Sequence, residues 1–442
     1  MDVESALAIV NTLIFEKTNQ HLSTLQTQIF RCAWSGQTYE KIAVTYYCSH
    51  THIKRLGTEV WKLLSMALEE EVTKKTFRAA LERYHYSKYN SNSIVISAPS
   101  IQKPRLTELE FPEGPVELGS PLYVERPPIE ERCYQTILKS GALIRIKAPH
   151  QMGKTSLVSR IQHFAQQKNY RTVTLNLQLA DSKIFEDLDR FLQWFCYVTR
   201  KLQLPLNLTD YWDEIFGSKT SCKDYFESYL IPQLEQPLVL ALDEVDTVFQ
   251  YPEIADNFFA LLRAWYEEAK SSDIWQNLRL IIVHSTEVYI PLNINQSPFN
   301  VGLPIELPEL NIEQVKKLAE LHGLNWNIDQ TKALMEMVSG HPYLVRIALY
   351  HIAHHQIALE EFLHFAPTES SPYSDHLRRH LLTLEQQPKL AIALKNLLAT
   401  TESVYLPSVE LFQLNRMGLI LLKENKIAFR CQLYRQYFSD RL

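Results

Sequence analysis

The chain lacks the cysteine patterns that build zinc sites or disulfide frameworks, because its six cysteines in 442 residues include no C-x-x-C pair. Such scattered cysteines are typical of a reducing compartment. Excess positive charge is also missing, and the net charge of −5 argues against general coating of nucleic acid while allowing a local basic face. No apolar run approaches the roughly 18 residues that span a bilayer, and the opening MDVESALAIV is acidic where a signal peptide is positive. We therefore expect a cytoplasmic protein with no membrane partner.

A stretch from 141 to 160, GALIRIKAPHQMGKTSLVSR, has the pattern of a strand, a tight loop and a helix. This is the architecture of a phosphate-binding P-loop, whose main-chain N–H groups and helix N-terminus surround an anion. Lys154 would reach the β- and γ-phosphates, and the Thr155 hydroxyl would hold Mg²⁺. Ala148 stands where the motif has glycine, and it fits if its φ is negative. The alternative is a chance Gly-Lys-Thr at a helix start. The loop residues expected to contact the nucleotide are Pro149, His150, Gln151, Met152, Gly153, Lys154, Thr155 and Ser156.

The segment 237–246, PLVLALDEVD, is an apolar run that ends in adjacent carboxylates. A continuous apolar run is typical of a strand buried on both faces of a parallel sheet. In P-loop enzymes the first acid, here Asp243, holds Mg²⁺, and the next, here Glu244, polarises the attacking water. Both are our catalytic candidates, and Asp246 is either a supporting group or solvated.

Two further polar positions are candidates for nucleotide contact. Arg126 precedes the loop by about 25 residues, and it either lies beside the base or phosphates or is an exposed loop arginine. A second buried strand, 278–283, is followed by Ser285 and Thr286. Either hydroxyl would form a hydrogen bond with the γ-phosphate when it is present. The alternative is that the hydroxyl caps the next turn.

Residues 1–84 read as helices, and within them Thr38 and Ser49 are predicted to begin two short helices with a turn near Tyr47. This is the pattern of a helix-turn-helix. Its second helix would present candidate nucleic-acid contacts at His52, Lys54 and Arg55. The alternative is a helical bundle used for protein contact.

The remaining segments complete a predicted domain order. Residues 85–118 are rich in Ser, Asn and Pro and predict a linker, and 119–308 predict the P-loop core. Helical patterns fill 309–370, a predicted lid, and 371–442 combine helices with a hairpin turning near Glu424 and Asn425. Helices with a two-stranded wing predict a winged-helix domain, which would bind DNA or pack on partner domains. The expected fold class is α/β: a P-loop NTPase core with a parallel sheet, preceded by an all-α helix-turn-helix domain.

With these motifs in place, residues 118–442 resemble the AAA-like family of bacterial signalling ATPases, related to the STAND class of switch NTPases. The likeness runs through YVERPPIE, APHQMGKTSL, LVLALDEVD, SGHPYLVRIALY and RCQLYRQYF. Residues 1–84 resemble the helix-turn-helix module at the N-terminus of vWA–MoxR-associated proteins. The resemblance implies Walker A roles for Lys154 and Thr155 and Walker B roles for Asp243 and Glu244. It also places Arg126 in a nucleotide-contacting loop.

The same resemblance matches Gly340, His341 and Pro342 to the G-x-P signature of the lid, where His341 would lie near the phosphates. Glu125 departs from the family, which usually has glycine there, and no arginine finger is assigned. The function expected is an ATP- and Mg²⁺-dependent switch with slow hydrolysis, ATP and ADP as ligands, a protein partner at the N-terminal module, and nucleotide-dependent homo-oligomerisation. The alternative is a DNA-binding AAA+ ATPase of the origin-binding or transposition-regulator type.

Overall fold

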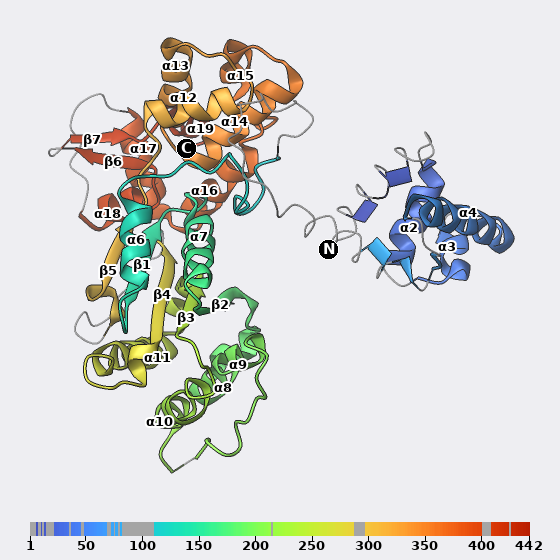
Figure 1. Ribbon diagram of the computed structural model, residues 1–442. Helices are drawn as coiled ribbons and strands as arrows, with labels where there is room; N and C mark the ends of the chain where they lie inside the picture. The colour runs from blue at the N-terminus through green and yellow to red at the C-terminus, as the bar shows by residue number, and fades with distance from the viewer. Residues whose placement is uncertain are drawn as a thin grey trace, which may run out of the picture. The chain divides into compact units, whose positions relative to one another are not determined.

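The computed structural model in Figure 1 divides the chain into two compact units, residues 1–101 and 102–442. Each unit is described by itself. The structure describes residues 6–7, 10, 13–14, 22–34, 37–45, 48–68, 72–74, 76–77, 80–81, 110–213, 215–286, 297–399, 408–423 and 426–442. The turns predicted near Tyr47 and at Glu424 and Asn425 therefore lie at least partly outside the described residues. In the parts of the chain that are described, no helix is long and apolar enough to cross a bilayer.

The first unit contains helices α2 (Thr24–Trp34), α3 (Tyr39–Thr45) and α4 (His50–Leu68). The predicted starts of α3 and α4 are confirmed, because the Thr38 hydroxyl accepts from the Lys41 N–H at 3.4 Å and the Ser49 hydroxyl accepts from the His52 N–H at 3.3 Å. Such caps satisfy main-chain donors that a helix start leaves without partners. Aromatic rings fill the core with centroids 4.8 to 6.3 Å apart, contributed by Phe30, Trp34, Trp61 and Phe77.

The second unit is built on a five-stranded sheet in the order β2-β3-β4-β1-β5, and every neighbouring pair is parallel. The strands are β1 (Leu143–Ala148), β2 (Arg171–Asn176), β3 (Leu238–Asp243), β4 (Leu278–Ser285) and β5 (Leu303–Glu306). β3 and β4 are buried along their whole length, as their apolar runs predict. The short LPIE segment of β5 is recognisable as a strand only through its pairing with β1.

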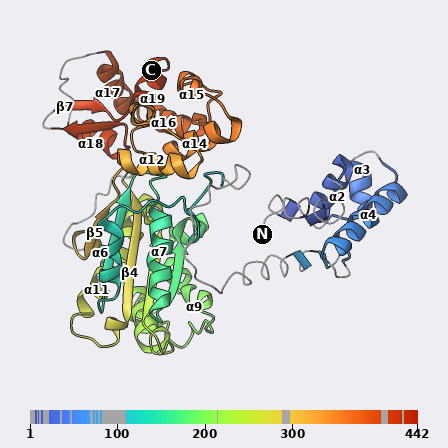
Figure 2. The same ribbon diagram turned by 45° about the horizontal axis from the view of Figure 1, so that its top comes forward.

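Helices cover both faces of this sheet (Figure 2). Alternate strand residues point to opposite sides, so Ile144 and Val239 join one apolar cluster and Leu143 and Leu240 join the other. The first cluster contains α6 (Ile129–Ile137) and α7 (Lys154–Gln167). The second contains α8 (Leu188–Phe195), α9 (Val198–Lys201), α10 (Ser218–Asp224) and α11 (Pro252–Glu268). Short helical turns also occur at Leu177–Leu179, Ser182–Glu186, Tyr225–Leu230, Val245–Gln250, Trp275–Asn277 and Pro298–Asn300.

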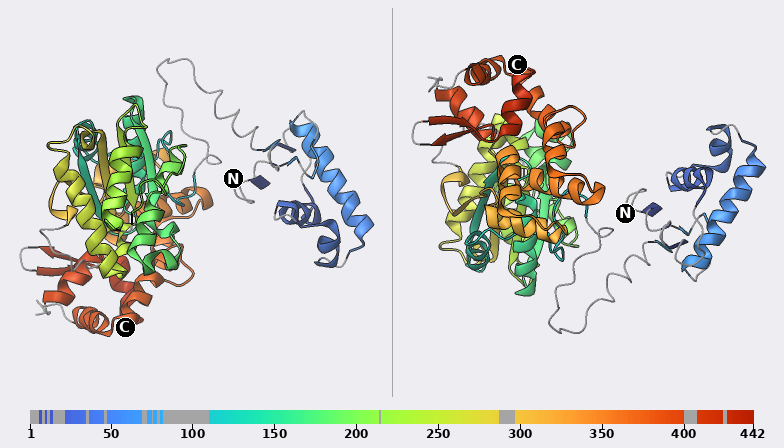
Figure 3. Two further views of the ribbon diagram at one scale, coloured as in Figure 1. Left: turned by 90° about the horizontal axis from the view of Figure 1, so that it is seen from below. Right: turned by 90° about the horizontal axis from the view of Figure 1, so that it is seen from above.

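The C-terminal part is helical and ends in a hairpin. Seen from above in Figure 3, these helices overlie the sheet. They are α12 (Ile312–Leu321), α13 (Ile328–Val338), α14 (Pro342–His355), α15 (Leu359–Phe365), α16 (Ser374–Gln386), α17 (Pro388–Ala399), α18 (Ser408–Arg416) and α19 (Gln432–Ser439), with β6 (Ile420–Lys423) antiparallel to β7 (Lys426–Phe429). One apolar core runs through this whole region, from Leu310 to Phe438, and includes Leu122 and Val124. The division at residue 370 into a lid and a winged-helix domain stays a prediction.

Residues 110–118, the end of the predicted linker, pack against the rest of the second unit. The Val116 N–H donates to the Ser156 hydroxyl at 2.9 Å, and the Arg160 guanidinium donates to the carbonyl of Val116 at 3.0 Å. Phe111 contacts Tyr350 of α14 edge to face, with ring centroids 5.1 Å apart. These contacts tie the segment to α7 and α14, so its low apolar content does not make this part a free tether.

Gly340 allows the closest approach between the start of α14 and the chain that enters α12. Its carbonyl accepts from the Leu310 N–H at 2.7 Å, and a Cβ at this position would collide with the Leu310 main chain. Forcing a methyl group into such a contact costs about 1 to 3 kcal/mol. We expect Gly340→Ala to lower the free energy of unfolding of the second unit by about 2 kcal/mol, measured by urea denaturation. Gly119→Ala is the control, because no atom lies within 4 Å of its added Cβ, and an equal loss in both variants would contradict this account.

Candidate functional site

Three neighbouring strands deliver the candidate residues to one edge of the sheet. β1 lies two places from β3 with β4 between them. Ala148 at the end of β1 pairs with Ser285, and Asp243 ends β3. Because parallel strands end at the same edge, residues about 90 positions apart in sequence come together here.

The loop after β1 leads into α7 through two residues of positive φ. Gly153 has a φ of 91° and Gln151 a φ of 61°, so two of its residues lie in the left-handed region. Ala148 is not among the residues of positive φ, and it continues the extended pairing of β1 with Ser285. The glycine that the motif lacks is therefore not required by the backbone at this position.

Lys154 is the first residue of α7 and is buried. Its ammonium donates to the carbonyls of Ala148 at 3.1 Å and Pro149 at 3.0 Å. The lysine thus folds back over the loop, and its charge lies at the position where the loop N–H groups and the helix N-terminus favour an anion.

Thr155 and Asp243 are in direct contact. The threonine hydroxyl donates to Asp243 Oδ2 at 3.2 Å, and the other carboxylate oxygen accepts from the Glu244 N–H at 3.0 Å. Burial raises the pKa of Asp243, while the Glu244 N–H, the Thr155 hydroxyl and the charge of Lys154 act in the opposite direction. Glu244 has a φ of 56°, a left-handed conformation that is uncommon for a residue with a Cβ. Its carboxylate accepts from the Gln178 amide at 3.5 Å.

The end of β4 is held from two sides. Asp246 is buried and accepts from the Ser285 N–H at 2.9 Å, so it supports the strand end and is not solvated. The Thr286 hydroxyl donates to the Arg416 carbonyl at 2.9 Å, and the Arg416 guanidinium donates back to the Thr286 carbonyl at 2.5 Å. Thr286 therefore connects the sheet to α18, whereas Ser285 is fully buried.

Arg126 hydrogen-bonds to the main chain of the P-loop. It is buried, and its guanidinium donates to the Met152 carbonyl at 2.8 Å. Its own N–H donates to the carboxylate of Glu130, which is also buried, at 2.9 Å. The alternative of an exposed loop arginine is thus excluded, and Arg126 lines an apolar recess behind Gly153.

His341 lies on another side of the loop. It is buried in a space of almost no free volume, together with Pro149, His150 and His376. Its ring centroid lies 5.4 Å from that of His376. His376 connects the helical part to the loop, because Nδ1 is 2.8 Å from Gln151 Oε1 and Nε2 is 2.8 Å from the Tyr434 hydroxyl. A neutral ring with its proton on Nδ1 satisfies both partners.

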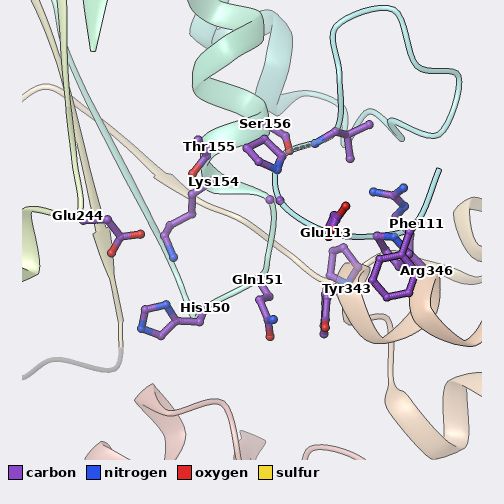
Figure 4. A pocket seen from close by; sticks show the side chains of 16 residues that line it. Phe111, Glu113, His150, Gln151, Lys154, Thr155, Ser156, Glu244, Tyr343 and Arg346 are labelled. Carbon is purple, nitrogen blue, oxygen red and sulfur yellow. Dashed lines mark hydrogen bonds between the residues drawn. The ribbon is translucent and has the colours of Figure 1, made fainter. Parts of the chain in front are cut away.

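A cavity of about 440 Å³ opens beside the P-loop (Figure 4). Lys154, Thr155 and Glu244 lie on one side of it, and Tyr343 and Arg346 lie on the other. Of the predicted site residues, His150, Gln151, Gly153, Lys154, Thr155, Ser156 and Glu244 line the cavity, whereas Pro149, Met152, Arg126, Asp243, Ser285 and His341 are not part of its lining. Pro342, part of the predicted G-x-P motif, also lines the cavity, whereas the wall formed by residues 111–116, Tyr343 and Arg346 was not predicted from sequence. The PEGP turn at 112–115 and the G-x-P motif at 340–342 were the available signals for this wall.

The nucleic-acid candidates lie in the first unit, on α4. Lys54 and Arg55 are exposed and His52 is half-buried, as the inward positions of Ile53 and Gly57 require. Nε2 of His50, at the start of the helix, lies 3.2 Å from a carboxylate oxygen of Glu40.

This arrangement of strands and helices is the fold of a P-loop ATPase. Residues 111–440 match the model of the AAA-like domain, and residues 1–84 match that of the vWA-MoxR associated protein N-terminal HTH. The chain belongs to the AAA-like domain family and carries that helix-turn-helix module at its N-terminus.

An uncharacterized WD repeat-containing protein of Synechocystis is 22% identical over 249 residues, which are 53% of this chain and 20% of that protein. The chain thus corresponds to about a fifth of that relative's length. Among solved structures, the Walker-type ATPase of Pyrococcus abyssi is 13% identical with a TM-score of 0.46, covering 71% of this chain and 95% of its own. The ORC2 protein of Aeropyrum pernix is 16% identical with a TM-score of 0.40, covering 70% and 92%.

Five buried histidines make stability depend on pH. Burial lowers the pKa of His341 and His380 to about 3, of His284 and His322 to about 4, and of His376 well below its usual value. The unfolded chain takes up these protons near pH 6.5, whereas the folded chain does not. The stability they contribute is therefore complete above about pH 6.5 and declines as the pH falls toward 4.

Each histidine adds a slope of up to about 1.4 kcal/mol per pH unit in that range. We expect His380→Gln to flatten the decline between pH 6.5 and 4 by up to that amount in denaturant titrations. His163→Gln is the control, because His163 is exposed on α7. An unchanged slope in His380→Gln would contradict the neutral, buried state of His380.

Proposed function

We propose that this protein is an ATP-dependent regulatory switch, in which ATP binding and slow hydrolysis alter how the C-terminal helices rest on the P-loop core. The main support is a single cavity between the P-loop and α14. Lys154 and Thr155 form one wall, and Pro342, Tyr343 and Arg346 form the other. A ligand that fills this cavity contacts both parts at once. Its binding free energy therefore depends on how the two are arranged.

The cavity suits ATP with Mg²⁺. Lys154 and the loop N–H groups would take the phosphates, and Thr155 with Asp243 would hold Mg²⁺, whose preferred ligands are oxygens of this kind. The bound metal would neutralise charge on the phosphates during transfer. Glu244 would orient and deprotonate the attacking water from the tip of β3.

The contacts between the loop and the C-terminal part give the switch its output. His376 of α16 bonds to Gln151 within the loop, and Arg416 of α18 exchanges two hydrogen bonds with Thr286. Phosphate binding that moves the loop would strain or relieve these contacts. Shifting the ratio of the two arrangements of the helices from 1:99 to 99:1 takes a difference in binding free energy of about 5.5 kcal/mol. A few charge-assisted hydrogen bonds to the nucleotide would supply it. The N-terminal module would receive or deliver the signal through a protein partner, and nucleotide would drive homo-oligomerisation.

Removing the lysine tests the phosphate site. We expect Lys154→Ala to weaken Mg²⁺–ATP binding by about tenfold to a hundredfold, because hydrogen bonds to charged groups contribute about 1.5 to 3 kcal/mol. Isothermal titration calorimetry measures the change. Lys147→Ala is the control, since Lys147 lies on β1 and pairs with Glu306 at 2.9 Å away from the cavity wall. Equal affinities in the wild type and Lys154→Ala would end the P-loop assignment.

Neutralising the second acid separates binding from turnover. Glu244→Gln should bind Mg²⁺–ATP with nearly wild-type affinity and hydrolyse it about 10² to 10⁴ times more slowly, the usual contribution of a general base. Release of inorganic phosphate under single-turnover conditions reports the rate. Glu253→Gln, an exposed position on α11, should hydrolyse at the wild-type rate. Unaltered turnover in Glu244→Gln would remove it as the base.

DNA binding is a second candidate function, favoured by the helix-turn-helix match over residues 1–84 and by the exposed Lys54 and Arg55 on α4. If it holds, duplex DNA should bind with a steep salt dependence, and Lys54→Glu/Arg55→Glu should abolish it. Fluorescence anisotropy at several salt concentrations measures both. Lys41→Glu/Lys62→Glu makes the same change of charge at exposed positions of α3 and α4. Equal binding by both double variants, or none by the wild type, would reject this function.

A further inference from the structure

Arg346 is a buried arginine whose hydrogen-bonding capacity is not used by the described part of the chain. It lies on α14, one turn after Pro342, with 7% of its surface exposed. Among the residues that the structure describes, none hydrogen-bonds to its Nε, and the nearest carboxylate oxygen, on Glu110, is 4.0 Å away. Burial lowers its pKa, and Glu110 acts in the opposite direction. A guanidinium held in this way is costly unless a ligand accepts its hydrogen bonds.

This arginine lies where two hollows meet. It lines the 440 Å³ cavity and also an adjoining recess of about 40 Å³. The recess is apolar, and its wall includes Leu122, Val124, Leu310 and Leu318. The two hollows also share Val116, Gly153, Ser156 and Pro342. The combination of an apolar wall and a few convergent polar groups is the usual lining of a small-molecule site.

The phosphate end and this end of the cavity are distinct. Figure 4 shows Lys154 and Glu244 on one side, with Phe111, Tyr343 and Arg346 on the other. If Lys154 takes the phosphates, the base of the same nucleotide extends toward the aromatic side chains and the recess. Arg346 then faces the base rather than the γ-phosphate.

We propose that Arg346 determines affinity for the base of the nucleotide, donating hydrogen bonds to ring-nitrogen acceptors of a purine that rests across the mouth of the apolar recess. This inference rests on the proposed ATP-binding function. A guanidinium only donates, so its partner must be an acceptor. The apolar wall beside it favours the flat face of a base over a hydroxylated ribose. Because Arg346 belongs to α14, base binding also connects the nucleotide to the helical part.

The test is calorimetric titration of the full-length protein and its Arg346→Met variant with ATP, ADP, 2′-deoxy-ATP and inorganic tripolyphosphate, each with Mg²⁺. Loss of the base contact should weaken ATP, ADP and 2′-deoxy-ATP binding by a similar factor of about ten or more. Tripolyphosphate binding should change by less than about twofold, because this anion retains its contacts with Lys154 and the loop. Arg435→Met, at an exposed position of α19, should bind all four as the wild type does.

Other outcomes overturn the proposal in recognisable ways. A larger loss for ATP than for ADP, or a loss for tripolyphosphate, would place Arg346 on a phosphate. A loss for ATP without one for 2′-deoxy-ATP would place it on the ribose, and unchanged affinities would leave it a structural residue. Arg346→Lys keeps the charge without the planar fork, and its ratio of ATP to tripolyphosphate affinity decides the question if Arg346→Met does not fold. A wild-type protein that binds no ATP would instead refute the proposed function itself.

Discussion

The hydrogen bond between Thr155 and Asp243 depends on the strand order, and the rest of the site depends on the same order. With β4 between β1 and β3, the ends of three parallel strands lie side by side, and the loop after β1 faces the acids after β3. The 3.2 Å contact between hydroxyl and carboxylate joins the start of α7 to the tip of β3. A sheet with a different order would separate the lysine from the acids and leave two unrelated motifs.

The P-loop is held from several directions by side chains that do not line the cavity. Arg126 holds the Met152 carbonyl from one side, and His376 bonds to Gln151 from the C-terminal helices. Burial keeps His376 and its neighbour His341 neutral by lowering the pKa of each. A neutral imidazole both donates and accepts, so it can connect the loop to Tyr434, whereas a charged one could only donate. These hydrogen bonds connect the loop directly to α16 and α19.

Much of this was predictable from sequence, and the reasons for the exceptions are physical. Lys154, Asp243 and Glu244 lie in local patterns where a strand meets a polar tip, and β3 and β4 carry continuous apolar runs. β5 has four residues and no pattern of its own, so only its partner β1 defines it. Residues 110–118 resemble a linker because main-chain hydrogen bonds to Ser156 and Arg160 leave no apolar signature. In the sequence, Arg346 is not distinguishable from the other residues of a helix. Its burial results from the packing of α14 beside the cavity, which the periodicity of the sequence does not predict.

The central claim is that one nucleotide contacts the P-loop and the start of α14 together. Amide hydrogen exchange with and without Mg²⁺–ATP, read by mass spectrometry, tests it most directly. The account predicts slower exchange in both 149–156 and 340–346 when nucleotide is present, and no such change in the Lys154→Ala protein. Protection confined to one of these segments, or equal protection in the variant, would contradict it.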